Sequence, residues 1–324
     1  MLNYLAGIKA EIANIEPDLE SKIGLLEEAV LSKEECLKLC SKVMPDFERK
    51  GETTLFAALR DYQDNYATLL TRLYELTNKP EHLREAIRAS QAAITSASKL
   101  DTVSLMAESY WKIAKAQDIM GEHLKAAGNF ELASESYLKA AQKAPQLKDF
   151  YQDYASYMQA WSEIETAKHH RAEKQHQQAK EHYEKAANLH ESTERWNYLS
   201  PNYLAWARLE AAEDLSTREQ TKEAKDLFWD AGRLFAEAKK SIRTRLEKIE
   251  ARDEKEMAVE LIEASDIREE YCIGRIALEE AKILARQGDN AASAREFGSA
   301  TRKLEKAIKA MERESDRQEL MQNN

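Results

Sequence analysis

A register of small and aromatic residues recurs four times along this chain and restricts its fold more than any other feature. In each copy, a small residue is followed by a second small residue at +12, an aromatic residue at +16 and a third small residue at +19. The copies are Gly121, Ala133, Tyr137 and Ala140; Ala167, Ala179, Tyr183 and Ala186; Ala212, Ala224, Phe228 and Ala231; and Ala281, Ser293, Phe297 and Ala300. Such spacing predicts pairs of antiparallel helices whose backbones approach closely at the small residues.

The aromatic residue of each copy has a separate task in this scheme. It is expected to fill the wedge between one helical hairpin and the next. A single hairpin would leave an apolar face in water, so the hairpins must stack on one another.

Composition supports an all-α fold. The chain has nine glycines and five prolines among 324 residues, and no proline follows Pro201. These residues punctuate turns and strands. Strong helix formers dominate the rest, and no run alternates in the two-residue period of a strand.

The four copies resemble the tetratricopeptide repeat, which has small residues at its eighth, twentieth and twenty-seventh positions and an aromatic at its twenty-fourth. In the copy from Ala114 to Pro145, Gly121 would lie in the first helix and residues 128–130 would form the turn. The resemblance implies a right-handed α-solenoid of stacked helical hairpins.

The chain departs from this family in two ways. The tryptophan early in the first helix of the family is replaced by Gln117, Glu163, Arg208 and Ala277. The equivalent small residues Ala133, Ala179 and Ala224 are 46 and 45 residues apart, whereas the family repeats every 34 or so. We expect longer helices to absorb the difference, which makes the hairpins similar to those of SNAP-type vesicle-fusion adaptors.

The pattern predicts three regions: a helical cap over 1–52, the solenoid over 53–318 and a frayed tail over 319–324. Because no Gly/Ser-rich or Pro-rich linker interrupts the chain, we expect one elongated domain. The cap should contain helices broken at Pro17 and Pro45, and capping boxes are expected at Ser32–Glu35 and Ser216–Glu219. Further helices are predicted at 53–77, 81–99, 102–127, 129–144, 147–172, 174–191, 197–215, 218–252, 254–287 and 289–318.

The resemblance also predicts a binding groove, because the family lines a concave surface with the second, fifth, ninth and twelfth residues of each first helix. The groove candidates that we select are Trp161, Ile164, Lys168, Arg171, Trp206, Leu209, Arg275 and Lys282; Glu213 and Ser216 occupy equivalent positions. Aromatic and arginine side chains are frequent interface anchors. The competing interpretation is that both tryptophans pack between neighbouring helices.

Charge and hydropathy restrict the partners. The net charge of −10 opposes nucleic-acid binding, and the densest basic stretch, Lys239–Arg245, is interpreted as a solvated helix face because Glu247 and Glu250 follow it. No apolar window is long enough for a membrane span, and the N-terminus lacks a signal-peptide pattern. Three cysteines, an odd number, favour reduced thiols and a cytoplasmic location.

Catalytic and metal sites are not predicted. The chain lacks G-x-S-x-G, H-E-x-x-H and Gly-rich phosphate-loop motifs. Cys36 and Cys40 supply only half of a metal site, and His169 and His176 lie among basic residues that would oppose a cation. We therefore expect no enzyme activity, no cofactor and no metal.

These observations favour a protein-interaction scaffold or adaptor that binds a peptide or helix of a partner in the groove. Two alternatives remain: a SNAP-like adaptor to an ATPase, which would use an acidic edge near Glu312–Asp316, and a helical-repeat domain that senses a small molecule. A homodimer through the N-terminal helices is a further hypothesis, since Leu25, Leu26, Val30, Leu37 and Leu39 require burial.

Overall fold

The computed structural model describes residues 2–50 and 53–320, with side chains described for 2–50, 53–251 and 254–311. These residues form twelve α-helices and two 3-10 helices, and none of them lies in a strand. The all-α prediction is therefore confirmed.

The elements follow in this order: α1 (Leu2–Ile15), α2 (Leu19–Lys50), α3 (Thr54–Thr77), α4 (Pro80–Lys99), α5 (Val103–Ile119), α6 (His123–Lys143), η1 (Pro145–Leu147), α7 (Lys148–Ala172), α8 (His176–Glu191), η2 (Asn197–Leu199), α9 (Ser200–Thr217), α10 (Thr221–Leu246), α11 (Arg252–Arg286) and α12 (Asn290–Leu320).

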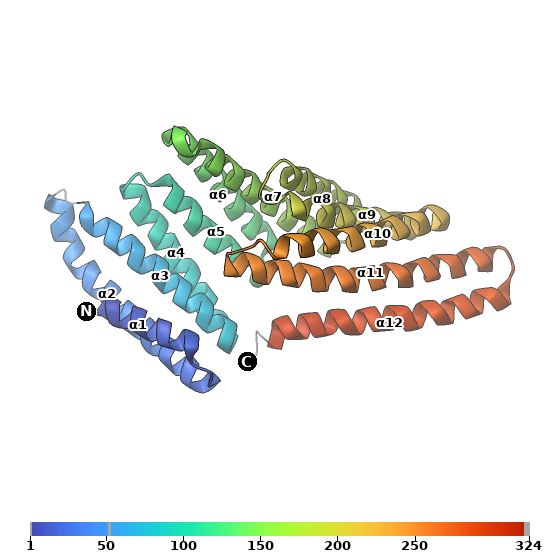
Figure 1. Ribbon diagram of the computed structural model, residues 1–324, viewed down its shortest axis with the longest axis horizontal. Helices are drawn as coiled ribbons and strands as arrows, with labels where there is room; N and C mark the ends of the chain where they lie inside the picture. Colours follow the sequence, from blue (N-terminus) through green and yellow to red (C-terminus); the bar gives the residue numbers. More distant parts are fainter. Residues whose placement is uncertain (1, 51–52, 321–324) are drawn as a thin grey trace. The chain divides into compact units, whose positions relative to one another are not determined.

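Contacts within the chain group these helices into two compact units. The first unit contains residues 1–158 and 316–324, and the second contains residues 159–315. In the first, α1 packs on α2, α2 on α3, and so on to α6 (Figure 1). In the second, α8 packs on α9, α9 on α10 and α10 on α11. Within each unit, these helices thus pack on their neighbours in sequence, as stacked hairpins require. The division predicted at residues 52 and 53 stays a prediction, and residues 51–52 and 321–324 lie outside the described part.

Long helices, rather than long loops, account for the wide spacing of the repeats. α10 has 26 residues and α11 has 35, which corresponds to about 39 and 52 Å at 1.5 Å per residue. The turns that join the helices of the second unit remain short, apart from the segments around η2 and before α11. The prediction of elongated hairpins is confirmed.

The same turn joins the two helices of a hairpin at four places, and it also joins α4 to α5 at Asp101. Gly121, Lys174, Glu219 and Gly288 all have left-handed backbones, with φ of 71°, 58°, 60° and 84°. At Glu219, the N–H of this residue donates to the carbonyl of Ser216 and the N–H of Gln220 donates to that of Leu215. This pair of bonds is the Schellman motif, which satisfies carbonyls left open at a helix end. Equivalent bonds occur at the other three turns.

These turns correct the register of the first repeat. In the three later copies, the left-handed residue of the turn is Lys174, Glu219 or Gly288. Relative to this residue, small residues lie at −7, +5 and +12, and an aromatic residue lies at +9. The same count from Gly121 gives Ala114, Ala126, Phe130 and Ala133, each at most 2% exposed. Gly121 therefore lies in the turn and not in a helix, and the predicted turn at 128–130 is wrong because those residues lie inside α6.

The reason for this error is geometric. The predicted copy was displaced by seven residues, which is close to two helical turns. A shift of that size leads to the same face of α6. Tyr137 and Ala140 are accordingly also buried.

Several local predictions near helix ends are wrong as well. The chain breaks around Pro17, but α2 continues through Pro45, whose position on an exposed face limits the loss to local backbone bonding. Ser32 lies inside α2 and donates to the carbonyl of Glu28, so it caps nothing. The Ser216–Glu219 capping box is also absent, because α10 begins only at Thr221. Helix α10 ends at Leu246 instead of residue 252.

The predicted repeat residues of the second unit lie mainly in its core. Ala212, Ala224, Phe228 and Ala231 belong to one buried cluster with Phe235, Leu209 and Cys272. The other buried members of the repeat are Ala167, Ala179, Tyr183, Ala186, Ala281, Ser293 and Ala300. Phe297 differs, since it is 40% exposed.

The N-terminal leucines and valine mostly pack inside the first unit. Leu26 lies in a buried cluster with Leu69 and Leu73, against which Leu25 and Val30 also pack. Leu37 packs against a neighbouring cluster, whereas Leu39 is exposed. The need for burial of these residues is thus largely met within one chain, and homodimerisation stays a prediction.

Candidate functional site on the first helices of the second unit

The predicted groove residues of the second unit fall into two groups. Ile164 and Leu209 are at most 2% exposed and belong to the core, so they line no surface. The other candidates are partly exposed: Trp161, Lys168, Arg171, Trp206, Arg275 and Lys282. They come from the second half of α7, from α9 and from α11, which are the first helices of three hairpins.

Trp206 on α9 collects side chains from α7 and α11. The guanidinium carbons of Arg171 and Arg268 lie 4.3 and 4.9 Å from the centroid of its indole ring. Tyr183 stacks on the indole at 5.7 Å, and Phe235 meets it edge-on at 5.6 Å. The ring is therefore a packing centre that holds cations in place, which favours the interpretation of Trp206 as a structural residue.

A buried carboxylate one turn further along α9 fixes Arg171. Glu210 is 1% exposed, and its carboxylate contacts Arg171 Nε at 3.2 Å and His176 Nδ1 at 2.7 Å. Burial raises the pKa of Glu210, while the hydrogen bond from His176 and the charge of Arg171 act in the opposite direction. These two partners are what allow a carboxylate to occupy this buried position.

Glu213, three residues later, joins α9 to α11. Nη1 of Arg275 lies 2.7 and 2.5 Å from the two oxygens of Glu213. The hydroxyl of Tyr271 donates to the same carboxylate at 2.7 Å. Burial raises the pKa of Tyr271 to about 12, and the negative charge of Glu213 adds to the effect. The phenol is therefore a donor across the physiological pH range.

Ser216 extends these contacts to Glu279 and Lys282. Its hydroxyl donates to Glu279 Oε1 at 2.7 Å and accepts from Arg275 Nη2 at 2.9 Å. Lys282 Nζ also donates to Glu279 Oε1 at 2.7 Å. The other oxygen of Glu279 is buried and has no hydrogen-bond partner within the described part of the chain.

We refer to these two groups of contacts together as the polar ladder; the first comprises Arg171, His176 and Glu210, and the second comprises Glu213, Ser216, Tyr271, Arg275, Glu279 and Lys282. It connects three successive first helices through side chains. Its acidic members Glu210 and Glu279 are at most 1% exposed, whereas Arg171 is 39% exposed and Lys282 is 32% exposed. Lys168, paired with buried Glu165 at 2.6 Å, is likewise 32% exposed. The surface of the ladder is consequently cationic.

Sequence reasoning located the basic members of the ladder but missed Glu210, Tyr271 and Glu279. These residues lie off the second, fifth, ninth and twelfth positions of their helices. A signal was available for Glu279, which stands four residues after Arg275 and three before Lys282, a spacing that brings side chains together on a helix. Tyr271 stands four residues before Arg275, the same kind of spacing, whereas no such pattern marks Glu210.

Trp161 is the remaining aromatic candidate. Its ring meets Tyr203 of α9 edge-on at 6.4 Å, and Tyr203 in turn stacks with Tyr183 and His190. Trp161 therefore contacts the same aromatic core as Trp206. Its assignment to a binding surface stays a prediction.

The histidine cluster is arranged differently from a metal site built on His169 and His176. His176 contacts Glu210, as described above. His170 stacks on His182 at 5.3 Å, and Nδ1 of His182 contacts Glu163 at 2.5 Å. Each of these rings is therefore engaged in a pairwise contact with a protein group.

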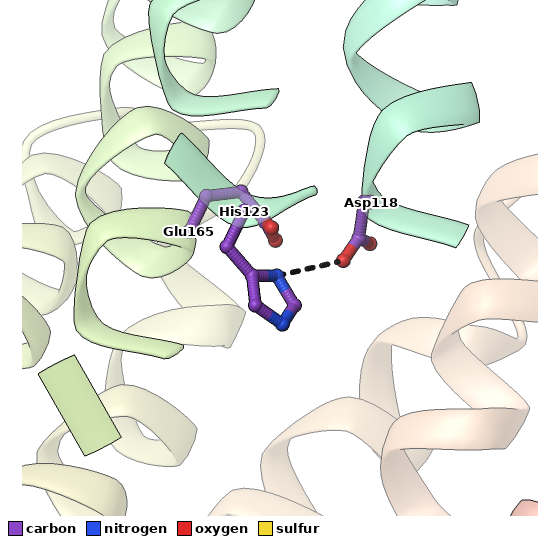
Figure 2. A group of neighbouring side chains, drawn as sticks. All are labelled: Asp118, His123 and Glu165. Atoms are coloured by element: carbon purple, nitrogen blue, oxygen red, sulfur yellow. Dashed lines mark ion pairs between the residues drawn. The ribbon is translucent and has the colours of Figure 1, made fainter. Parts of the chain in front are cut away.

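In the first unit, Asp118 and His123 approach one another across the turn at Gly121, with 3.7 Å between Asp118 Oδ1 and His123 Nδ1 (Figure 2). The pair supplies two donor groups, fewer than the three or four protein ligands of a typical zinc site. Glu165, also drawn in Figure 2, belongs to the second unit and pairs there with Lys168.

The chain therefore belongs to the class of all-α proteins whose helices stack as hairpins. In its second unit, the polar ladder runs across the first helices of these hairpins. No family model matches the chain, and no curated protein matches its sequence. Among the residues described, no helix is sufficiently long and apolar to cross a membrane.

Proposed function

We propose that the second unit binds an acidic segment of a partner protein along the polar ladder, so that the chain acts as an interaction scaffold or adaptor. The observation that carries this proposal is the difference in burial within the ladder. Glu210 and Glu279 of the ladder, and Glu165 beside it, are at most 1% exposed, while the side chains of their partners Lys168, Arg171 and Lys282 remain about one-third exposed.

The burial pattern supports binding because it positions the cations in advance. Long lysine and arginine side chains lose much rotational entropy when they are ordered at an interface. Here the buried carboxylates of Glu165, Glu210 and Glu279 already hold them. A partner with acidic side chains would therefore bind at a lower entropic cost, and complementary charge would favour its association rate.

The aromatic anchor of the predicted groove has a smaller part in this proposal. Trp206 is covered by two guanidinium groups and two aromatic rings, so little of its ring is available to a partner. The partner that suits this surface is recognised through charge more than through an apolar side chain.

The test begins with selection of peptides from a random displayed library on the full-length chain. We expect the selected peptides to be enriched in Asp and Glu. Their affinity, measured by fluorescence anisotropy, should fall about tenfold or more in the double variant Lys168→Gln, Lys282→Gln. Glutamine keeps a donor for Glu165 and Glu279 but removes the charge that the peptide requires.

A matched control comes from exposed lysines on second helices. Lys222→Gln with Lys309→Gln removes the same charge from α10 and α12, where neither lysine forms an ion pair with a described side chain. We expect this variant to bind as the wild type does. Selected peptides without an acidic bias, or equal losses in both double variants, would contradict the proposal.

The alternatives stay hypotheses. An adaptor that stimulates an ATPase through Glu312–Asp316 relies on side chains outside those described. A domain that senses a small molecule would be supported by thermal stabilisation with a metabolite.

A further inference from the structure

A shallow groove lies at the end of α10, away from the residues of the polar ladder. Its volume is about 440 Å³. Its lining comes from the last turns of α10 and the turn that follows, together with one residue of η2: Tyr198, Glu237, Lys240, Ser241, Thr244, Arg245 and Lys248. Glu237, Ser241 and Thr244 are spaced by four and three residues, so they share one face of the helix.

The charges of this groove are unbalanced. Lys240, Arg245 and Lys248 contribute three positive charges, and none of them forms an ion pair with any carboxylate described in the structure. The one acidic residue in the lining, Glu237, is already paired with Arg233. Neighbouring basic residues behave differently, since Lys239 is paired with Asp266 and Glu269.

The side chain of Arg245 is held in place, yet one of its N–H donors has no hydrogen-bond partner among the described residues. Its guanidinium lies 5.9 Å from the centroid of the Tyr198 ring. The Tyr198 hydroxyl is fixed in turn by a bond to Glu254 Oε1 at 3.1 Å. The Nε atom of Arg245 is buried and has no hydrogen-bond partner among the described residues. A buried donor without an acceptor is costly, so an acceptor brought by a ligand would be favourable.

Three uncompensated cations exceed what a single carboxylate can neutralise. A phosphomonoester carries a charge between −1.5 and −2 near neutral pH and offers three strong acceptor oxygens. Arginine and lysine are the side chains that bind such groups. The groove volume also falls within the range of about 300–1,000 Å³ that is usual for small-molecule sites, which leaves room for the organic part of the ester.

We propose that the groove formed by Tyr198, Lys240, Ser241, Arg245 and Lys248 binds a phosphomonoester. This site is separate from the polar ladder and does not rest on the function proposed above. The negative charge of the whole chain, −10, opposes long polyanions such as nucleic acids and favours a compact group that fits between the three cations.

The test uses the full-length chain and three probes: O-phosphoserine, a short peptide that contains phosphoserine, and the same peptide with serine. Isothermal titration calorimetry should detect both phosphorylated probes and not the serine peptide. Both lysines are exposed, so Lys240→Gln with Lys248→Gln should preserve the fold. This variant should weaken phosphoserine binding by about tenfold or more.

The control and the probes decide the outcome. Lys222→Gln with Lys309→Gln removes two charges elsewhere and should leave binding unchanged. If the phosphorylated peptide binds more tightly than free O-phosphoserine, the ligand is a modified protein; if the two bind equally, it is a small phosphorylated molecule. Absence of binding by either phosphorylated probe, equal loss in the control, or tighter binding of a single-stranded oligonucleotide that depends on Lys240 and Lys248 would overturn the proposal.

Discussion

Arg275 on α11 contacts both carboxylate oxygens of Glu213 on α9, although the two residues are 62 positions apart. Both side chains are about 85% buried. This ion pair connects the first helices of two hairpins, which otherwise make few backbone contacts. Alignment of the polar ladder therefore depends on side chains that reach across the space between two helices.

The pair should be strongly coupled in stability measurements. Glu213→Leu or Arg275→Met alone leaves a buried charge without its partner, and each should lower the free energy of unfolding by about 3–5 kcal/mol. The double variant should lose clearly less than the sum of the two. Urea denaturation followed by circular dichroism measures all three, and additive losses would show that the two charges are not coupled.

Gly274 should be essential for the approach of α11 to α12. A Cβ atom at this position would lie 2.7 Å from Cδ2 of Leu304 and 3.2 Å from its backbone nitrogen. We expect Gly274→Ala to destabilise the protein by about 1–3 kcal/mol through overpacking. Gly128→Ala is the control, because a Cβ there meets nothing within 4 Å and should stabilise α6 by up to about 1 kcal/mol. The stabilities of the two variants are compared by thermal unfolding. Equal changes in stability, of the same sign, would refute the packing argument.

The left-handed turns predict opposite effects for reciprocal substitutions. Lys174→Gly should stabilise the protein by about 0.5–1 kcal/mol, because glycine relieves the strain of a left-handed backbone. Gly121→Ala should destabilise it by about 1 kcal/mol for the same reason. Lys222→Gly, in the right-handed first turns of α10, serves as the control and should destabilise. Denaturant midpoints provide the measurement; a loss of stability in Lys174→Gly would contradict the role of these turns.

His190 should make stability fall in mild acid. The residue is fully buried beside Tyr203, and burial lowers the pKa of His190 to about 3. An unfolded histidine has a pKa near 6.5, so the unfolded chain binds more protons between these values. The stability that the neutral, buried form of His190 contributes is complete above pH 6.5 and is lost as the pH falls towards 3.

The size of this loss can be measured directly. At pH 5, His190 alone should reduce the free energy of unfolding by about 2 kcal/mol relative to pH 8. In His190→Leu, the free energy of unfolding should therefore fall by about 2 kcal/mol less between pH 8 and pH 5 than it does in the wild type. Urea denaturation at several pH values tests the prediction, and identical slopes for the variant and the wild type would refute it.

Residue patterns were sufficient to predict most of the helices. The scarcity of glycine and proline, together with the small–aromatic spacing, predicted helices close to α3, α4, α7, α8, α9, α11 and α12. They succeeded because small residues that permit close helix packing recur at fixed offsets from each turn. The same periodicity caused the error at Gly121, since a displacement of seven residues preserves the face of a helix and so preserves the pattern.

Tertiary structure alone decided the arrangement of charges. The sequence placed Lys168, Arg171, Arg275 and Lys282 at surface positions of first helices, but it did not reveal that Glu210 and Glu279 are buried. Ion pairs between residues tens of positions apart form only when the stacking of hairpins brings α7, α9 and α11 together. The sequence thus determined which segments are helical and which faces they bury, because those properties depend on local periodicity. Which charges neutralise one another, and which remain for a partner or a phosphate group, was decided by packing between hairpins, because Coulomb interactions depend on distance and burial in space rather than on position in the chain.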